Sequence, residues 1–287
     1  MSDPQTLGAT NRALLAGLVA TATGFAQQSR SANTTKAYAS DWSHFAAWAD
    51  GADLSTLPAS PGTVALYLTA YSGSLKGTTL SRRLTAIRQA HAVAGKPFNA
   101  AAPELREVWK GIVRTKGRAS DPVAPAVLQD LIAMLAGLPD TLTGIRDRAL
   151  LLTGFAGGFR RSELTGLEME NLTFTNDGLV VNLRRSKTDQ EGEGSKVGVP
   201  YGQHDRTCPV LALQRWLVGS GITDEHGLNG SGKVFRSVTR HGSVGESLST
   251  KAVSLIVKRA AEGAGLDPSK YAGHSLRSGF ATSAAAA

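Results

Sequence analysis

The sequence predicts a mainly α-helical protein with a small antiparallel β-sheet, built as an N-terminal helical bundle followed by an α+β domain. Amphipathic helical patterns fill the first part of the 287-residue chain. Two β-rich runs around a Gly- and Glu-rich turn occur only in the second part. Between the parts, "TKGRASDPVAP" is polar, basic and proline-bearing, as interdomain linkers are. We therefore expect a helical domain at residues 1–118 and a second domain at residues 119–287.

Aromatic residues define the first predicted helix, "NTTKAYASDWSHFAAWADG". They recur at helical spacing and form one apolar stripe, which comprises Tyr38, Trp42, Phe45 and Trp48. The second helix, "SPGTVALYLTAYSG", carries Ser60 at a cap position and Pro61 at the first helical position, where proline is favoured.

Two further helices complete the predicted bundle. In "TTLSRRLTAIRQAHAVAGKP", the side chains expected to point inward are Leu80, Leu84, Ile87 and Val93. On the same helix Arg82, Arg83 and Arg88 fall outside that apolar face. In "APELREVWKGIVRTKGR", the inward residues are Leu105, Val108, Trp109 and Ile112. The first domain is therefore a bundle of about four helices.

The excess positive charge lies in this first domain. Residues 1–118 contain 13 Lys and Arg against 6 Asp and Glu, and the remainder contains 18 against 17, within a net charge of +8. A basic surface commonly serves a polyanion, of which nucleic acid is the usual one, although it also serves solubility.

The second domain mixes helices with strands. The predicted helices are at about 125–136, 142–155 and 162–169, then "CPVLALQRWLVGSG", "STKAVSLIVKRAAEGAGL" and a last one beginning near His274. The run "LTFTNDGLVVNLRRSKTDQEGEGSKVGVP" predicts three antiparallel strands.

Several protein classes are excluded by composition. No apolar stretch is long enough to span a bilayer, and the N-terminus lacks the pattern of a signal peptide. The single cysteine, Cys208, allows no internal disulfide and no cysteine-built zinc site, and we expect it to be half-buried at a helix start. The histidines show no metal-ligand spacing. A cytosolic protein is the default expectation.

Three short segments carry candidate chemistry. In "GGFRRSELTGLE", Arg160 follows two glycines and precedes Ser162, a plausible helix cap, so it can help hold an anion, and Glu163 can brace it. In "LRRSKTDQEGEGSK", Lys187 stands in a hairpin and can donate a proton to a leaving oxygen.

In "HSLR", His274 and Arg277 are three residues apart and would share a helix face, where they can stabilise a phosphodiester in transit. Taken alone, the segments of Arg160 and Lys187 also suit an ordinary solvated surface, and a lone histidine on a helix is more often a structural hydrogen-bonding residue.

In their joint order, these segments resemble the tyrosine recombinase (phage integrase) family, over almost the whole chain. "NTTKAYASDWSHFAAW" is similar to its first core-binding helix, "GGFRRSEL" to its first arginine box and "RSKTDQEGEG" to its catalytic-lysine hairpin. "CPVLALQRWL" and "HSLRSGFAT" are similar to two further family segments. The resemblance implies a SAM-like core-binding domain and a catalytic domain that close around duplex DNA.

The resemblance also implies the roles of the site residues. Arg160 and Arg277 would hold the scissile phosphate, His274 would assist proton handling, and Lys187 would protonate the departing 5′ oxygen. A tyrosine would form a 3′-phosphotyrosyl link, so neither ATP nor a metal cofactor is required. The implied partners are double-stranded DNA with inverted-repeat sites and further copies of the chain in a tetramer. The resemblance also implies a bacterial or phage-encoded protein that lies in the cytoplasm and associates with the nucleoid.

The nucleophile departs from the family pattern. In the family it lies several helical turns beyond H-x-x-R, but here only "SGFATSAAAA" follows. The tyrosines, all of which precede His274, are Tyr38, Tyr67, Tyr71, Tyr201 and Tyr271. We expect a C-terminally truncated chain that binds DNA without cleaving it and forms a weakened tetramer.

Alternatives to a recombinase are a non-catalytic DNA-binding derivative, a type IB topoisomerase, and a basic helical RNA-binding or scaffold protein. Candidate DNA-facing residues in the first domain are Lys36, Arg82, Arg83 and Arg88, and most contacts of this kind go to phosphates.

Overall fold

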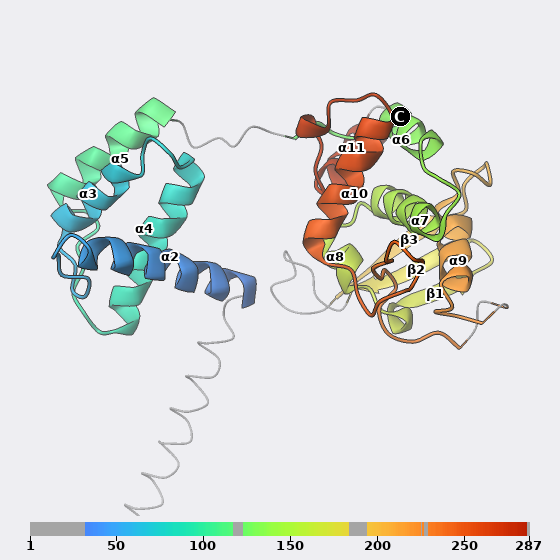
Figure 1. Ribbon diagram of the computed structural model, residues 1–287, viewed down its shortest axis with the longest axis horizontal. Helices are drawn as coiled ribbons and strands as arrows, with labels where there is room; N and C mark the ends of the chain where they lie inside the picture. The colour runs from blue at the N-terminus through green and yellow to red at the C-terminus, as the bar shows by residue number, and fades with distance from the viewer. Residues whose placement is uncertain (1–31, 117–122, 184–193, 225, 227–228, 286–287) are drawn as a thin grey trace, which may run out of the picture. The chain divides into compact units, whose positions relative to one another are not determined.

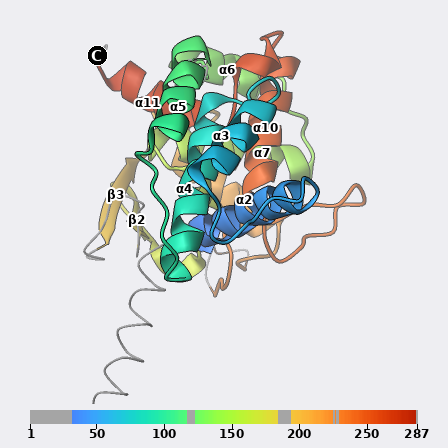
Figure 2. The same cartoon turned by 90° about the vertical axis from the view of Figure 1, so that its left-hand side faces the viewer.

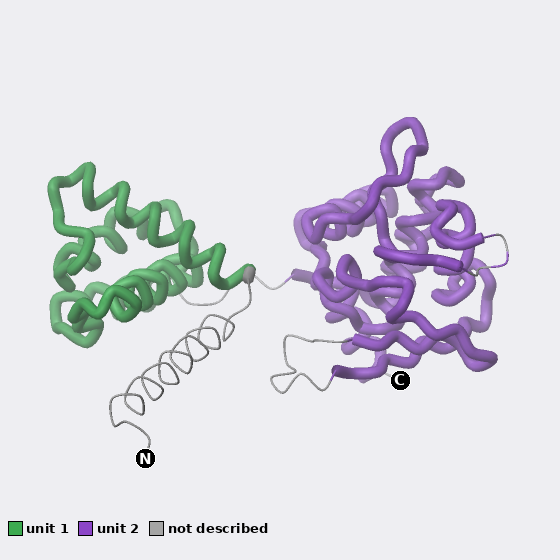
Figure 3. Tube along the Cα trace, turned by 90° about the horizontal axis from the view of Figure 1, so that it is seen from below, with its two compact units in different colours: residues 1–122 green, residues 123–287 purple. Residues whose placement is uncertain are grey.

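The computed structural model describes residues 32–116, 123–183, 194–224, 226 and 229–285 (Figure 1). The chain divides into two compact units, Met1–Pro122 and Val123–Ala287 (Figure 3). Each unit has a hydrophobic core of its own. The division falls between Pro122 and Val123, four positions after the predicted boundary.

Unit 1 is helical, as its amphipathic patterns predict. Its described helices are α2 (Ala32–Asp50), α3 (Pro61–Ala70), α4 (Gly77–Val93) and α5 (Pro103–Lys116). Helix α2 packs on α4, and α3 packs on α5 (Figure 2). The predicted cap is confirmed, because the Ser60 hydroxyl accepts a hydrogen bond from the Thr63 N–H and Pro61 opens the helix.

Several residues predicted to point inward form the core of unit 1. Phe45, Leu80, Ile87 and Leu105 are fully buried. The inward placement of Val93 is wrong, because Val93 is 78% exposed in the last turn of α4. There it lines an open groove beside Tyr38 and Trp42.

Unit 2 combines a three-stranded antiparallel sheet with helices. The strands β1 (Leu172–Thr175), β2 (Gly178–Leu183) and β3 (Ser195–Pro200) are in the order β1-β2-β3, which confirms the predicted sheet. The described helices are α6 (Leu128–Ala136), α7 (Leu142–Ala156), α8 (Arg161–Gly166), α9 (Pro209–Gly219), α10 (Thr250–Gly263) and α11 (Ser275–Ala285), with short 3₁₀ turns at Met169–Asn171 and Pro268–Lys270.

Helix α7 is the centre of unit 2. It packs on α9 along one side and on α11 along another (Figure 1). Ala149, Leu150 and Leu151 are completely buried, because helices cover α7 on more than one face. Trp216 of α9 is also completely buried, and its indole N–H donates to the Val234 carbonyl at 2.8 Å. This rigid helix positions the segment that follows it.

The prediction that Cys208 is half-buried is wrong. Its side chain is fully buried, because the sulfur accepts hydrogen bonds from the N–H groups of Gly202 and Leu211 and caps α9. Among the described helices we find none with the length and hydrophobicity that crossing a bilayer requires.

Candidate active site

The segment between α7 and α8 places Arg160 at a helix start. Helix α7 ends at Ala156 with Gly157 as its C-cap residue, and Gly158 adopts a left-handed conformation with a φ of +57°. The chain then turns so that Arg160 itself is the N-cap residue of α8, with a φ of −70° and a ψ of 150°. The expectation that Ser162 is the cap is therefore wrong. Ser162 lies inside the helix, because α8 begins one residue earlier, at Arg161.

Glu163 fixes both the backbone and the side chain of Arg160. One carboxylate oxygen accepts the Arg160 backbone N–H at 2.8 Å, and the other accepts Nη1 of the guanidinium at 2.6 Å. The side chains are only 18% and 8% exposed, respectively. The charged hydrogen bond thus holds the guanidinium at the entrance of α8.

Arg277 reaches the same segment from α11. Its Nη1 donates to the carbonyl oxygen of Gly158 at 2.7 Å. The helices can approach because Gly154 lacks a side chain: a Cβ there would meet Leu164 of α8 and Leu276 of α11, each at 2.9 Å. Arg277 is exposed, so other N–H donors of its guanidinium can reach an anion. The hydrogen bond that anchors Arg277 to the Gly158 carbonyl was not predicted. The two adjacent glycines, Gly157 and Gly158, are the sequence feature that could have indicated it.

His274 lies in the turn that leads into α11, one residue before the helix begins. The turn is closed by a hydrogen bond from the Ala272 N–H to the Ser275 hydroxyl at 3.0 Å. The turn also lies against α8, since a Cβ built on Gly273 would be 3.3 Å from the Arg161 Cβ. The imidazole is exposed.

The segment 158–161 is therefore the meeting point of the candidate residues. It carries Arg160, bonds Arg277 through its Gly158 carbonyl and touches the turn that carries His274. Arg160, Arg277 and the turn that carries His274 come from separate parts of the chain and meet at this short piece of backbone. Such a group can hold a tetrahedral anion and exchange a proton with it.

Lys187 lies outside the described residues, within 184–193. The strands on either side of this segment are described, and their register pairs Leu183 with Ser195. The role expected for Lys187 remains a prediction.

Tyr271 is the tyrosine nearest in sequence to His274, and its hydroxyl has a partner. The hydroxyl donates to the Asp130 carboxylate at 3.0 Å, and the residue is buried. Burial and the hydrogen bond to Asp130 raise the pKa of the Tyr271 phenol. A buried, hydrogen-bonded phenol with a raised pKa is poorly suited to act as a nucleophile.

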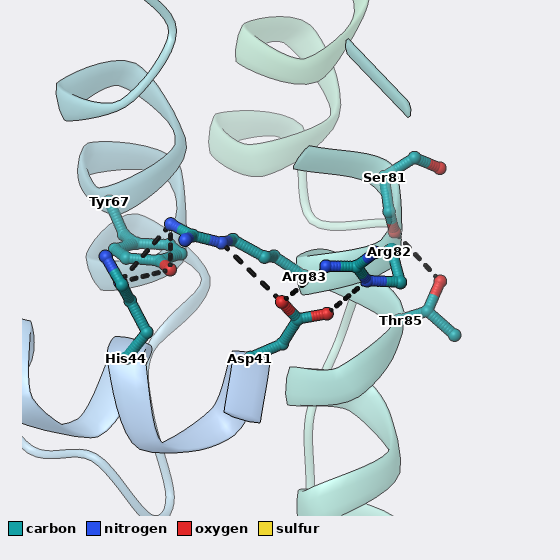
Figure 4. Close-up of polar contacts among 7 residues, drawn as sticks. All are labelled: Asp41, His44, Tyr67, Ser81, Arg82, Arg83 and Thr85. Carbon is teal, nitrogen blue, oxygen red and sulfur yellow. Dashed lines mark hydrogen bonds and ion pairs between the residues drawn. The ribbon is translucent and has the colours of Figure 1, made fainter. Parts of the chain in front are cut away.

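In unit 1 the four basic residues predicted to face DNA have different surroundings. Lys36 and Arg88 are exposed. Arg82 is half-exposed and makes a bidentate ion pair with Asp41, at 2.6 and 3.0 Å (Figure 4). The carboxylate holds the guanidinium of Arg82 in one orientation.

The expectation that Arg83 lies on an outer face is wrong. Arg83 is buried, and its Nη1 donates to the Tyr67 hydroxyl at 2.9 Å and lies 3.2 Å from Nδ1 of His44 (Figure 4). Its Nε is 3.8 Å from the Asp41 carboxylate, within ion-pair distance. These partners on α2 and α3 offset the charge inside the unit, which allows the guanidinium to be buried although its Nε has no hydrogen-bond partner.

Comparison with known families identifies the fold. Residues 124–286 match the phage integrase family, and residues 25–96 match the phage integrase N-terminal SAM-like domain. The chain belongs to the phage integrase family. An integrase-type catalytic domain thus contains the meeting point at residues 158–161, and a SAM-like domain contains Lys36, Arg82 and Arg88.

Named relatives agree with this assignment. The chain is 42% identical to an integrase/recombinase xerD homolog of Selenomonas ruminantium over 265 residues, covering 90% of this chain and 75% of that protein. It is 30% identical to the tyrosine recombinase XerD of Xanthomonas axonopodis pv. citri, covering 62% of this chain and 59% of the relative. By family, the protein is a recombinase enzyme of the tyrosine class.

Solved structures share the fold at low identity. A XerH site-specific recombinase bound to a palindromic difH substrate aligns with a TM-score of 0.54 at 19% identity, covering 78% of this chain and 61% of that one. A lambda integrase dimer bound to a COC′ core site aligns with a TM-score of 0.54 at 18% identity, covering 98% of this chain and 73% of that one.

Proposed function

We propose that the protein is a site-specific DNA recombinase that cleaves and rejoins strands through a 3′-phosphotyrosyl intermediate. In this proposal Arg160 and Arg277 hold the scissile phosphate, His274 holds it and handles a proton, and Lys187 protonates the departing 5′ oxygen. Glu163 positions Arg160. The observation that supports the proposal best is the convergence of Arg160, Arg277 and the His274 turn on residues 158–161.

The arrangement suits phosphoryl transfer for physical reasons. A planar guanidinium donates two parallel hydrogen bonds to a phosphate, and two of them offset the charge that develops on the transferred group. A covalent enzyme–DNA link divides one difficult displacement into two easier ones and conserves the bond for rejoining. The proposed reaction therefore needs no nucleotide cofactor and no metal ion.

The proposed partner is double-stranded DNA with inverted-repeat sites. The related XerH and lambda integrase structures are complexes with DNA, and the lambda protein is a dimer in its complex. We propose that the SAM-like unit and the catalytic unit both contact the duplex, with Lys36, Arg82 and Arg88 toward phosphates. In the complete reaction four copies would assemble on two sites, in the bacterial cytoplasm.

DNA binding tests the first half of the proposal. Fluorescence anisotropy should show tighter binding to a duplex with inverted repeats than to a shuffled duplex or an RNA hairpin, with steep salt dependence. Arg160→Ala and Arg277→Ala should each weaken binding to the specific duplex, while the exposed Arg240→Ala should leave it unchanged. Equal affinity for all three nucleic acids would support a general RNA-binding or scaffold protein instead.

Strand cleavage tests the second half. The tyrosines among the 287 residues all precede His274. We expect a polypeptide of these residues alone to bind a nicked suicide duplex without forming a covalent complex. A protein–DNA band on a denaturing gel would contradict this expectation, and mapping the linked peptide would identify the tyrosine. Reading the frame beyond codon 287 for a tyrosine separates a recombinase from a non-catalytic derivative.

A further inference from the structure

A cationic pocket lies in unit 2 at the end of α7 farthest from the candidate active site. It is formed by the end of α6, the first half of α7, the loop before α9 and α9 itself, and has a volume of about 540 Å³. Arg148 and Gly158 are ten residues apart along α7 and its C-cap, which corresponds to about 15 Å of helix. The pocket is thus separate from the proposed phosphate site.

Three arginines from different parts of the chain line this pocket: Arg148 on α7, Arg206 in the loop and Arg215 on α9. Arg148 is partly buried and held in place, because its Nη2 donates to the Leu135 carbonyl at 2.9 Å and its Nη1 to the Arg206 carbonyl at 3.4 Å. The Arg206 and Arg215 side chains are exposed, and neither has an ion-pair or hydrogen-bond partner within the described part of the chain.

Positive charge is in excess at this place. Asp140 is the one carboxylate lining the pocket, against three guanidiniums, and it forms no ion pair with them in the described part of the chain. Burial lowers the pKa of the Arg148 guanidinium, Asp140 opposes this shift, and Arg206 and Arg215 add to it. Guanidiniums remain charged in proteins, so this crowding is unfavourable until an anion neutralises it.

The lining also has an apolar part. Ile132 and Leu135 of α6, with Leu138 just after it, form an apolar wall, and Thr207 adds a hydroxyl to the charged groups. A pocket volume of about 300–1,000 Å³ with an apolar wall and a few convergent charged groups is typical of small-molecule sites. The convex backbone of a duplex offers a line of phosphates on a surface and brings no apolar group that would use this wall.

We propose that this pocket binds a small phosphate-bearing anion with a flat apolar part, of the mononucleotide class. The phosphate lies between Arg148, Arg206 and Arg215, and the flat group lies on the leucine and isoleucine wall. This site is independent of the proposed DNA chemistry.

Isothermal titration calorimetry of the full 287-residue chain tests the pocket, with adenosine monophosphate as the probe and inorganic phosphate and adenosine as its two halves. We expect the monophosphate to bind more tightly than either half. Arg206→Gln and Arg215→Gln should each weaken it about tenfold, because each removes a charged hydrogen-bond donor. Arg240→Gln is the matched control, since Arg240 is exposed in another loop, and it should bind as the unmodified chain does.

Two outcomes would overturn the proposal. One is that the monophosphate does not bind at concentrations up to about 10 mM, roughly ten times the 1 mM Kd of a weak ligand, or that it binds the pocket variants and the control equally tightly. The other is a loss of duplex affinity and of salt dependence in Arg206→Gln and Arg215→Gln without any binding of the monophosphate, because the phosphates recognised would then be those of DNA. Unchanged duplex affinity in both variants, together with weakened monophosphate binding, supports the small-anion site.

Discussion

Replacing Glu163 by glutamine tests how firmly the entrance of α8 is held. The carboxylate accepts two hydrogen bonds from Arg160, at 2.8 and 2.6 Å. Glutamine keeps one acceptor oxygen and places an NH₂ group where the other was, so one donor of Arg160 loses its partner. A hydrogen bond to a charged group contributes about 1.5–3 kcal/mol, and breaking a fully buried ion pair costs about 3–5 kcal/mol. Because the Arg160 side chain is 18% exposed, water offsets part of the loss, and we expect about 2 kcal/mol.

Urea unfolding measures this loss in unit 2. Trp216 is the one tryptophan among residues 123–287, so its ¹⁹F signal in protein labelled with 5-fluorotryptophan reports on unit 2 alone. With a slope of about 2 kcal/mol per molar urea, the midpoint should fall by about 1 M. Glu246→Gln, at an exposed position, should shift the midpoint by less than about 0.3 M. Equal midpoints for the two variants would refute the reasoning.

Three other substitutions test neighbouring features. Gly158→Ala places a side chain at a φ of +57° with its Cβ 3.0 Å from Phe280. We expect it to lower the free energy of unfolding by about 2 kcal/mol in calorimetry, and an unchanged Tm would contradict the left-handed turn. Burial and Arg83 lower the pKa of His44 from its usual value of 6.5. The neutral ring therefore stabilises unit 1 above pH 6.5, and this stability is lost as the pH falls from 6.5 toward the folded-state pKa. His44→Gln should flatten the pH dependence of unit 1 unfolding between about pH 7 and 5, and equal slopes would argue against it. Asp41→Asn removes a buried carboxylate that two arginines approach, and should destabilise unit 1 by about 2–3 kcal/mol in urea; a loss below about 0.5 kcal/mol would show that water already screens the pair.

Local patterns were enough to predict the helices and the sheet. Ser60 and Pro61 start α3 as predicted, because a cap is a contact between residues three apart in the sequence. The β1–β2–β3 sheet also follows from neighbouring segments, since its strands are consecutive along the chain. The apolar stripe of α2 predicted a buried face because Phe45 recurs at the helical period with the other aromatics.

The environment of single side chains could not be predicted in the same way. Arg83 is buried because it contacts Asp41, His44 and Tyr67, which lie on other helices. No sequence pattern within α4 predicts those partners. The bond from Arg277 to the Gly158 carbonyl likewise joins positions 119 residues apart. The resemblance to a family could bring Arg160, His274 and Arg277 together, but the apolar and charged periodicities could not.

Two backbone hydrogen bonds tie the first residues of unit 2 to the turn that carries His274. The Ala124 N–H donates to the Lys270 carbonyl at 2.8 Å, and the Ala126 N–H donates to the Ser275 carbonyl at 2.9 Å. Gly279 permits this approach, because a side chain there would collide with the Ala126 carbonyl. A displacement of these first residues would therefore also move the turn that presents the imidazole, the group proposed to handle a proton.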